Sequence, residues 1–150
     1  MSIGAYADEI EIPPYNDMQG KPLTPIECLT VNAYHESRGE SDVANYFVMA
    51  VVAKRVLDDR HKATDFCEAV FHPKAFSWTS DGLSDRITEE GQYRRLYRLA
   101  FKFMSNIEIY LDMAEGADHY HKVGHKTNWD YSVLDYIGRI DNHEFYRWKR

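Results

Sequence analysis

The chain of 150 residues carries 18 lysines and arginines against 24 aspartates and glutamates, a formal charge of −6, and its length fits one domain. Hydrophobic residues make up 44% and charged residues 28%, which excludes a mainly disordered chain. Residues 1–50 hold eight acids and two bases, whereas the rest is nearly neutral and shows no basic stripe, which argues against binding of nucleic acid. No apolar run is long enough to predict a membrane span.

The N-terminal segment differs from the rest of the chain in composition. Residues 1–22 are acidic, are interrupted by Pro13-Pro14 and Gly20, and show no periodicity. They also lack the basic and apolar regions of a Sec signal peptide. We therefore expect an extended arm over residues 1–22, followed by one domain over residues 23–150.

Two helices are predicted next. Thr24 can cap the first helix, Pro25 suits its first position, and Glu27 completes a capping box. Gly39 ends this helix, and Ser41 can cap a second one that continues to about residue 57. The second helix is apolar over a wide face and is expected to be the buried central helix.

Two further helices follow. Thr64-Asp65 opens a short helix that Pro73 ends, and residues 74–87 are expected to form a loop. A single long helix is predicted over residues 88–114, because apolar residues recur there with helical spacing and Gly116 ends the pattern.

The periodicity of the apolar residues changes in the C-terminal third of the chain. Residues 118–121 and 139–146 are predicted as short strands, joined by a loop that contains Trp129. The predicted fold class is therefore α+β, mainly helical with a small antiparallel β element near the C-terminus.

The two cysteines, Cys28 and Cys67, are too few for a disulfide framework and lack metal-site spacing. We expect two half-buried thiols in a protein made in a reducing compartment. A disulfide between them is an open alternative, because the sequence does not reveal their separation.

Glu36 is the most informative single residue. The apolar stripe of the first helix passes through Leu29 and Ala33, and its next position is Glu36. A partly desolvated carboxyl has a raised pKa, as a general acid requires. An ion pair with Arg38 or Arg55 is the structural alternative, and periodicity alone favours it.

Glu40 lies one turn further and is a possible second carboxylate of a two-acid glycosidase. Gly39 is expected to end the helix between the two acids, so their separation is undetermined. The favoured interpretation is structural, with Glu40 bonding backbone amides or an arginine.

Histidines gather late in the chain, and an H-x-H pair on a strand places both rings on one face. A zinc site is an alternative, but H-E-x-x-H is absent and the downstream spacing is loose, so neither a metal nor another cofactor is expected. Histidines that bond substrate or a carboxylate explain the pattern equally well. The cluster consists of His119, His121, His125 and His143.

Several segments together resemble the SleB-like cell-wall hydrolases, the spore-cortex-lytic family that also occurs in phage lysins. Each motif alone is weak, but their common order is fairly specific. The chain departs from the residues usual in this family at a few positions. His35 stands in place of a glycine, Ser37 in place of an alanine, Lys54 in place of an asparagine, and Asp141 or Asn142 in place of a glycine. The segments that carry the resemblance are the E-S-R-G-E stretch within residues 33–40, the helix 48–56, the turn 70–78, the Y-H pair within 117–121, Trp129, and residues 140–146.

The resemblance implies a lysozyme-like fold that cleaves peptidoglycan glycan strands, with Glu36 as the catalytic acid. It also implies a domain that works without a metal, which weakens the zinc alternative. Aromatic and polar side chains are expected to bind the sugars, with Trp78 a better candidate than Phe76, for which core packing is favoured. The substrate-binding candidates are Ser77, Trp78, Tyr120, His121, Trp129, His143 and Tyr146.

The expected reaction is that of a lytic transglycosylase, which needs only one acid. The alternatives are a muramidase that uses Glu40 or an aspartate to position water, and a non-catalytic glycan-binding or virion-structural relative. We expect a monomeric phage endolysin, made in the host cytoplasm and reaching the cell wall after release.

Overall fold

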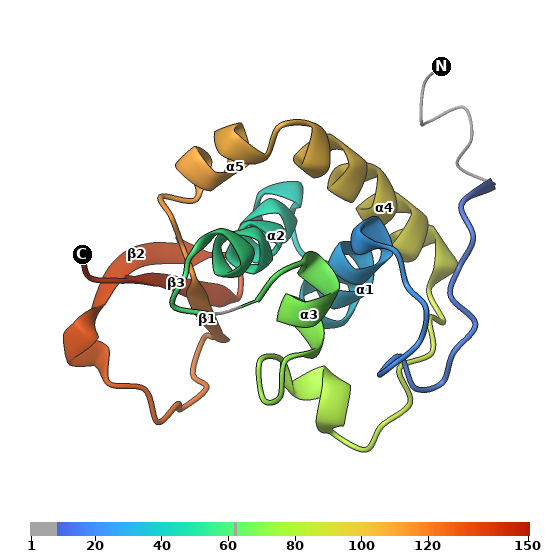
Figure 1. Ribbon diagram of the computed structural model, residues 1–150, viewed down its shortest axis with the longest axis horizontal. Coiled ribbons are helices and arrows are strands. Elements are labelled where there is room, and N and C mark those ends of the chain that lie inside the picture. The colour runs from blue at the N-terminus through green and yellow to red at the C-terminus, as the bar shows by residue number, and fades with distance from the viewer. Residues whose placement is uncertain (1–8, 62) are drawn as a thin grey trace.

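The computed structural model describes residues 9–61 and 63–150 (Figure 1). It confirms the α+β class, with helices in the first three quarters of the chain and a small antiparallel sheet at the end. Short 3₁₀ turns lie at Ser77–Ser80 and Tyr131–Val133. The main elements are α1 (Pro25–Ser37), α2 (Asp42–Leu57), α3 (Phe66–Phe71), α4 (Glu90–Ser105), α5 (Ile107–Met113), β1 (His119–Lys122), β2 (Leu134–Ile140) and β3 (His143–Trp148).

The first two helices begin where the sequence predicts. The Thr24 hydroxyl accepts a hydrogen bond from the Glu27 amide, and the Glu27 carboxylate accepts one from the Thr24 amide, which completes the capping box. The Ser41 hydroxyl caps α2 by accepting from the Ala44 amide. Helix α2 contacts α1, α3, α4, α5 and β1, so it is the buried central helix (Figure 1).

The single long helix predicted over residues 88–114 is wrong, because Asn106 divides it into α4 and α5. Asn106 leaves helical geometry with φ −145° and ψ 41°. The break lets the chain curve over α2, as Figure 1 shows. It also lets Tyr110 stack on both Phe103 and Tyr46, at ring-centroid distances of 5.4 and 4.3 Å. Packing of these rings decides the bend, which helical periodicity does not reveal.

The strand predicted over residues 139–146 is wrong as one unit, since a turn at Asp141-Asn142 divides it between β2 and β3. Asp141 adopts the left-handed backbone conformation, with φ 50°. The sheet order is β1-β3-β2, antiparallel throughout. Strand β2 was missed because its register shifts between Tyr136 and Gly138, which interrupts the alternation expected of a strand.

The described part of the N-terminal segment, residues 9–22, lies on the helical body. Ile10 and Met18 are buried in the core. The Met18 amide donates to the Asp85 carboxylate at 2.9 Å, and the Asp85 amide donates to the Asn16 carbonyl at 2.8 Å. These contacts fix the segment against the loop before α4. None of the helices in the described residues is both long and apolar enough to cross a membrane.

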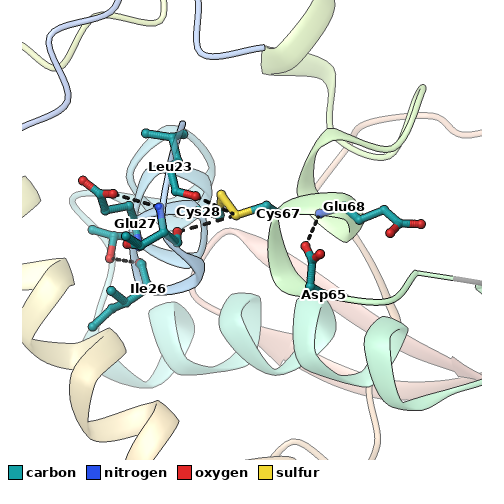
Figure 2. The surroundings of a disulfide bond; sticks show 9 residues. Leu23, Ile26, Glu27, Cys28, Asp65, Cys67 and Glu68 are labelled. Carbon is teal, nitrogen blue, oxygen red and sulfur yellow. Dashed lines mark hydrogen bonds between the residues drawn. A yellow bond between two sulfur atoms is a disulfide. The ribbon is translucent and has the colours of Figure 1, made fainter. Parts of the chain in front are cut away.

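The two cysteines form a disulfide, so the expectation of two thiols is wrong (Figure 2). Cys28 lies in the second turn of α1 and is fully buried, and Cys67 lies near the start of α3. Their Cα atoms are 5.1 Å apart although 39 positions separate them in sequence. Packing of α3 against α1 creates this proximity, and the spacing of the two cysteines in the sequence does not indicate it.

The bond closes a loop that contains all of α2, and its removal should destabilise the fold. A Cys28→Ser/Cys67→Ser double variant is expected to lose about 2–4 kcal/mol of unfolding free energy in urea denaturation, because the unfolded chain regains the entropy of an open loop of this length. The wild type under reducing conditions is the matched comparison. An unchanged midpoint, or two titratable thiols in the native oxidised protein, would contradict the disulfide.

Candidate active site

Glu36 lies in the last turn of α1, at a cleft of about 790 Å³. The capping box at Thr24 sets the register of α1, which turns this carboxyl toward the β1 strand and not into solvent. The side chain is half-buried, in agreement with its place on the apolar stripe. The stripe therefore ends in an acid at the edge of the core.

The walls of the cleft come from two distant parts of the chain. One wall is the segment that leads through Phe76 and Trp78, and the other is β1 with the loop that follows it. His35, Glu36 and His143 lie between these walls. The structure therefore brings together most of the predicted site residues: Glu36, Ser77, Trp78, Tyr120, His121, Trp129 and His143 all line the cleft.

In the part of the chain that the structure describes, the Glu36 carboxyl has one direct side-chain partner, Tyr120. The Tyr120 hydroxyl donates to Glu36 Oε1 at 2.6 Å. Burial raises the pKa of Glu36, and the Tyr120 hydrogen bond opposes part of this rise, as do the more distant charges of His143, Lys122 and Arg55. Burial and the Glu36 charge raise the pKa of Tyr120 well above its ordinary value, so this hydroxyl remains a donor. The pair joins α1 to β1.

The ion pair considered for Glu36 is not formed. Arg38 bonds Glu89 instead, and its guanidinium lies over the Tyr34 ring at 4.4 Å. Arg55 donates through Nε to the Asp118 carbonyl at 3.0 Å. Across residues 9–61 and 63–150, no lysine, arginine or histidine nitrogen lies within ion-pair distance of Glu36. The carboxyl is thus available to take up and release a proton.

Glu40 faces a neighbouring hollow that Glu36 also lines, but its carboxylate is engaged by the β2–β3 turn. Glu40 Oε1 accepts from the Asn142 amide at 3.0 Å and from His143 Nδ1 at 3.0 Å. Asp141 reinforces this contact by accepting from the Ser41 amide at 2.8 Å. Glu40 therefore holds the turn of the hairpin against the α1–α2 connection, as its structural interpretation requires.

The late histidines have separate partners. His143 donates to Glu40, while His119 donates through Nδ1 to the buried Asp118 carboxylate at 2.8 Å. His121 donates through Nδ1 to the Lys122 carbonyl, so its Nε2 accepts from the Tyr146 hydroxyl at 3.1 Å. In the part of the chain that the structure describes, no three histidine, cysteine or acidic side chains are grouped to hold a metal ion.

Phe76 and Trp78 are both buried, with exposed fractions of 4% and 6%, and both line the cleft. The Trp78 indole donates to Asn32 Oδ1 at 2.8 Å and stacks on His35 at 4.4 Å. Trp78 is thus held firmly in the cleft wall, while Ser77 between these two aromatics is exposed.

Tyr146 is the one predicted binding residue that does not line the cleft. Its ring stacks on His121 at 5.4 Å, and its hydroxyl donates to His121 Nε2. Tyr146 therefore orients His121 without lining the cleft itself. Trp129 lies at an edge-to-face distance of 5.7 Å from His121 and forms part of the cleft wall.

Asn32 and Arg55 belong to this site, although the sequence analysis did not select them for it. Asn32 lies one turn before Glu36, is fully buried, and holds Trp78 through its carbonyl oxygen. Its amide nitrogen lacks a well-aligned partner among the described residues, but the side chain lies beside the Tyr120 hydroxyl and lowers its pKa slightly. A buried polar residue four positions before Glu36 was the signal that could have identified it. Arg55 lines the cleft with its guanidinium 5.1 Å from the Phe76 ring centre.

Comparisons with known proteins give two findings. Residues 39–146 match the family model described as Cell Wall Hydrolase, a span that begins three positions after Glu36. The crystal structure of the catalytic domain of the Bacillus cereus SleB protein has a similar fold, with a TM-score of 0.57, 24% sequence identity, and coverage of 88% of this chain and 96% of that chain. None of the curated proteins matches the chain.

The family match covers well over half of the chain, and the structural match covers 88% of it. Both findings agree with the resemblance carried by the sequence motifs. The chain therefore belongs to the cell wall hydrolase family.

Proposed function

We propose that this cell wall hydrolase cleaves the MurNAc–GlcNAc bond of peptidoglycan as a lytic transglycosylase, with Glu36 as acid and then as base. The observation that carries the proposal is the half-buried Glu36 carboxyl, whose pKa is raised by burial and whose Oε1 accepts from Tyr120. Because Oε1 is occupied by this donor, the other carboxyl oxygen is left to carry the transferable proton.

The reaction balances without water. Glu36 donates its proton to the glycosidic oxygen, the bond from that oxygen to C1 of MurNAc breaks, and positive charge develops at C1. The Glu36 carboxylate then takes the proton of the MurNAc C6 hydroxyl, whose oxygen bonds to C1 and closes a 1,6-anhydro ring. Tyr120 stabilises the carboxylate between the two proton transfers.

The chemical composition of the cleft walls suits the binding of sugar rings. Its walls combine aromatic side chains with polar groups, as sites for small ligands commonly do. Trp129 and Trp78 contribute apolar surface, while Ser77, His121 and His143 offer hydrogen-bonding groups.

We place the action of the enzyme at the cell wall, outside the membrane. The disulfide supports this location, because such bonds form and persist outside the reducing cytosol. In the endolysin role that we favour, the chain is made in the host cytoplasm and its disulfide forms after release.

Replacement of Glu36 tests the catalytic assignment. Digestion of purified peptidoglycan should yield anhydro-MurNAc ends by mass spectrometry, and Glu36→Gln should reduce their formation by about 10²–10⁴-fold. Glu108→Gln, at an exposed position on α5, is the matched control and should retain full activity. Reducing MurNAc ends would assign a muramidase instead, and no cleavage by the wild type would favour a glycan-binding protein.

The pH dependence of the unfolding free energy of Glu36→Gln distinguishes loss of the catalytic group from misfolding of the variant. A folded-state pKa above the unfolded value means that ionised Glu36 destabilises the fold at high pH, whereas both states are protonated at low pH. Glu36→Gln should therefore gain unfolding free energy relative to wild type as the pH rises from about 3 to about 8.

Tyr120→Phe tests the positioning of Glu36. The Tyr120 hydrogen bond lowers the pKa of Glu36, so its loss should raise that pKa further and move the alkaline limb of the pH–rate profile to higher pH. The maximal rate should fall about tenfold, because the carboxylate formed by proton donation loses a donor. Tyr136→Phe removes an exposed hydroxyl that bonds Glu144 and is the control. Identical pH profiles for wild type and Tyr120→Phe would show that Tyr120 does not act on Glu36.

Glu40→Gln tests the two-carboxylate alternative. It weakens the bonds to Asn142 and His143 and should cost about 1–2 kcal/mol of unfolding free energy while leaving turnover within about threefold of wild type. Complete loss of turnover at an unchanged melting temperature would instead make Glu40 a catalytic partner.

A further inference from the structure

A second cavity, of about 300 Å³, adjoins the cleft. Arg55, Ala75 and Trp129 line both spaces, so the two are neighbours separated by these side chains. The proposed reaction uses only the larger cleft, and the second cavity has no role in it.

The second cavity collects cationic and imidazole groups. Arg55 and Lys74 line it, together with the rings of His61 and His119, and the lining includes no carboxylate among the described residues. The cavity is therefore suited to an anion.

Neither cation forms an ion pair among the described residues, although the charges of Asp118 and Glu36 act on Arg55 from a greater distance. Within the described ranges, neither Arg55 nor Lys74 lies within 4.0 Å of a carboxylate oxygen. The acid nearest to this group, Asp118, is fully buried, and its carboxylate already accepts from His119 and from the Trp148 amide. Among the described residues, Arg55 bonds the Asp118 carbonyl through Nε and makes no other hydrogen bond, which leaves its terminal amino groups available.

His61 adds an enclosed polar atom to the wall. Its Nε2 is buried and has no hydrogen-bond partner among the residues that the structure describes. The ring is held by stacking on Trp148 at 4.5 Å. Burial and the neighbouring Arg55 charge lower the pKa of His61 to about 4, so the ring is neutral near pH 7 and can offer one N–H.

We propose that this cavity binds a carboxylate of the substrate, carried by the lactyl group of the muramyl sugar or by the peptide attached to it, while the cleft holds the sugar rings. The inference rests on the proposed function, since it assigns a second part of the same substrate. Arg55 offers a planar fork for the carboxylate, and Lys74 adds a second charge at the rim. The indoles of Trp129 and Trp148 pack against the apolar part of the substituent.

The consequence is discrimination between glycans by charge. Strands that contain muramyl groups present carboxylates beside the sugar backbone, whereas polymers of GlcNAc alone are neutral. The second cavity therefore contributes to the binding of glycans that contain muramyl groups and does not contribute to the binding of GlcNAc polymers.

Calorimetric titration in the Glu36→Gln background tests the inference without turnover. The probes are a MurNAc–GlcNAc tetrasaccharide with peptide stems and neutral chitotetraose. Lys74→Gln should weaken binding of the first about fivefold where the peptide supplies the carboxylate, and should leave binding of the second unchanged. Lys102→Gln, an exposed substitution on α4, is the control. His61→Gln should show the same selectivity.

A third probe identifies the source of the carboxylate. In a tetrasaccharide stripped of its stems by an amidase, the lactyl carboxylate is free. In the stem-bearing probe the lactyl carboxyl is an amide, so a Lys74→Gln penalty confined to that probe assigns the peptide carboxylates, and a penalty confined to the stripped probe assigns the lactyl carboxylate.

Equal effects of Lys74→Gln on acidic and neutral glycans, or no effect on either, would overturn the second site while leaving the proposed reaction intact. Conversely, the wild-type protein could bind acidic glycan through Lys74 and yet cleave no peptidoglycan. This result would support the second site and overturn the proposed reaction.

Discussion

The placement of one carboxyl at the edge of the core governs the organisation of this protein. Glu36 ends the apolar stripe of α1, so the helix cannot pack without removing this group partly from water. Tyr120 on β1 compensates by donating to the carboxyl at 2.6 Å. A helix from the first third of the chain and a strand from the last third are thereby joined at the point where the chemistry is proposed to occur.

The surrounding contacts hold these two elements in place. Near its start, α1 is bonded to α3 by the disulfide, and α3 leads into the wall that contains Phe76 and Trp78. Beyond its C-terminal end, Glu40 and Ser41 bind the turn between β2 and β3. The start of α1 is therefore fixed to the wall that contains Phe76 and Trp78, and the segment after its end is fixed to the sheet that contains β1. The asparagine one turn before Glu36 bonds Trp78 directly.

Charge is distributed unevenly around the site. The Glu36 carboxyl has no ion pair among the described residues, which preserves a proton that can be transferred, while the cavity beside it gathers Arg55 and Lys74 without a carboxylate partner. Arg55 lines both spaces, and it contacts Phe76 in one wall and the Asp118 backbone beneath the other. Sugar rings and acidic substituents can thus be recognised by neighbouring but chemically distinct surfaces.

Local signals in the sequence determined the starts of α1, α2 and α3 and the partly buried position of Glu36, because caps and helical periodicity depend on residues within a few positions of each other. Most of the residues that the motifs selected for the site line the cleft. Only the tertiary structure decided the break at Asn106, the hairpin turn at Asp141 and the disulfide, since each depends on packing between segments distant in sequence. It likewise decided that Glu36 bonds Tyr120 and not an arginine, because 84 positions separate the two partners and no pattern along the chain records their contact.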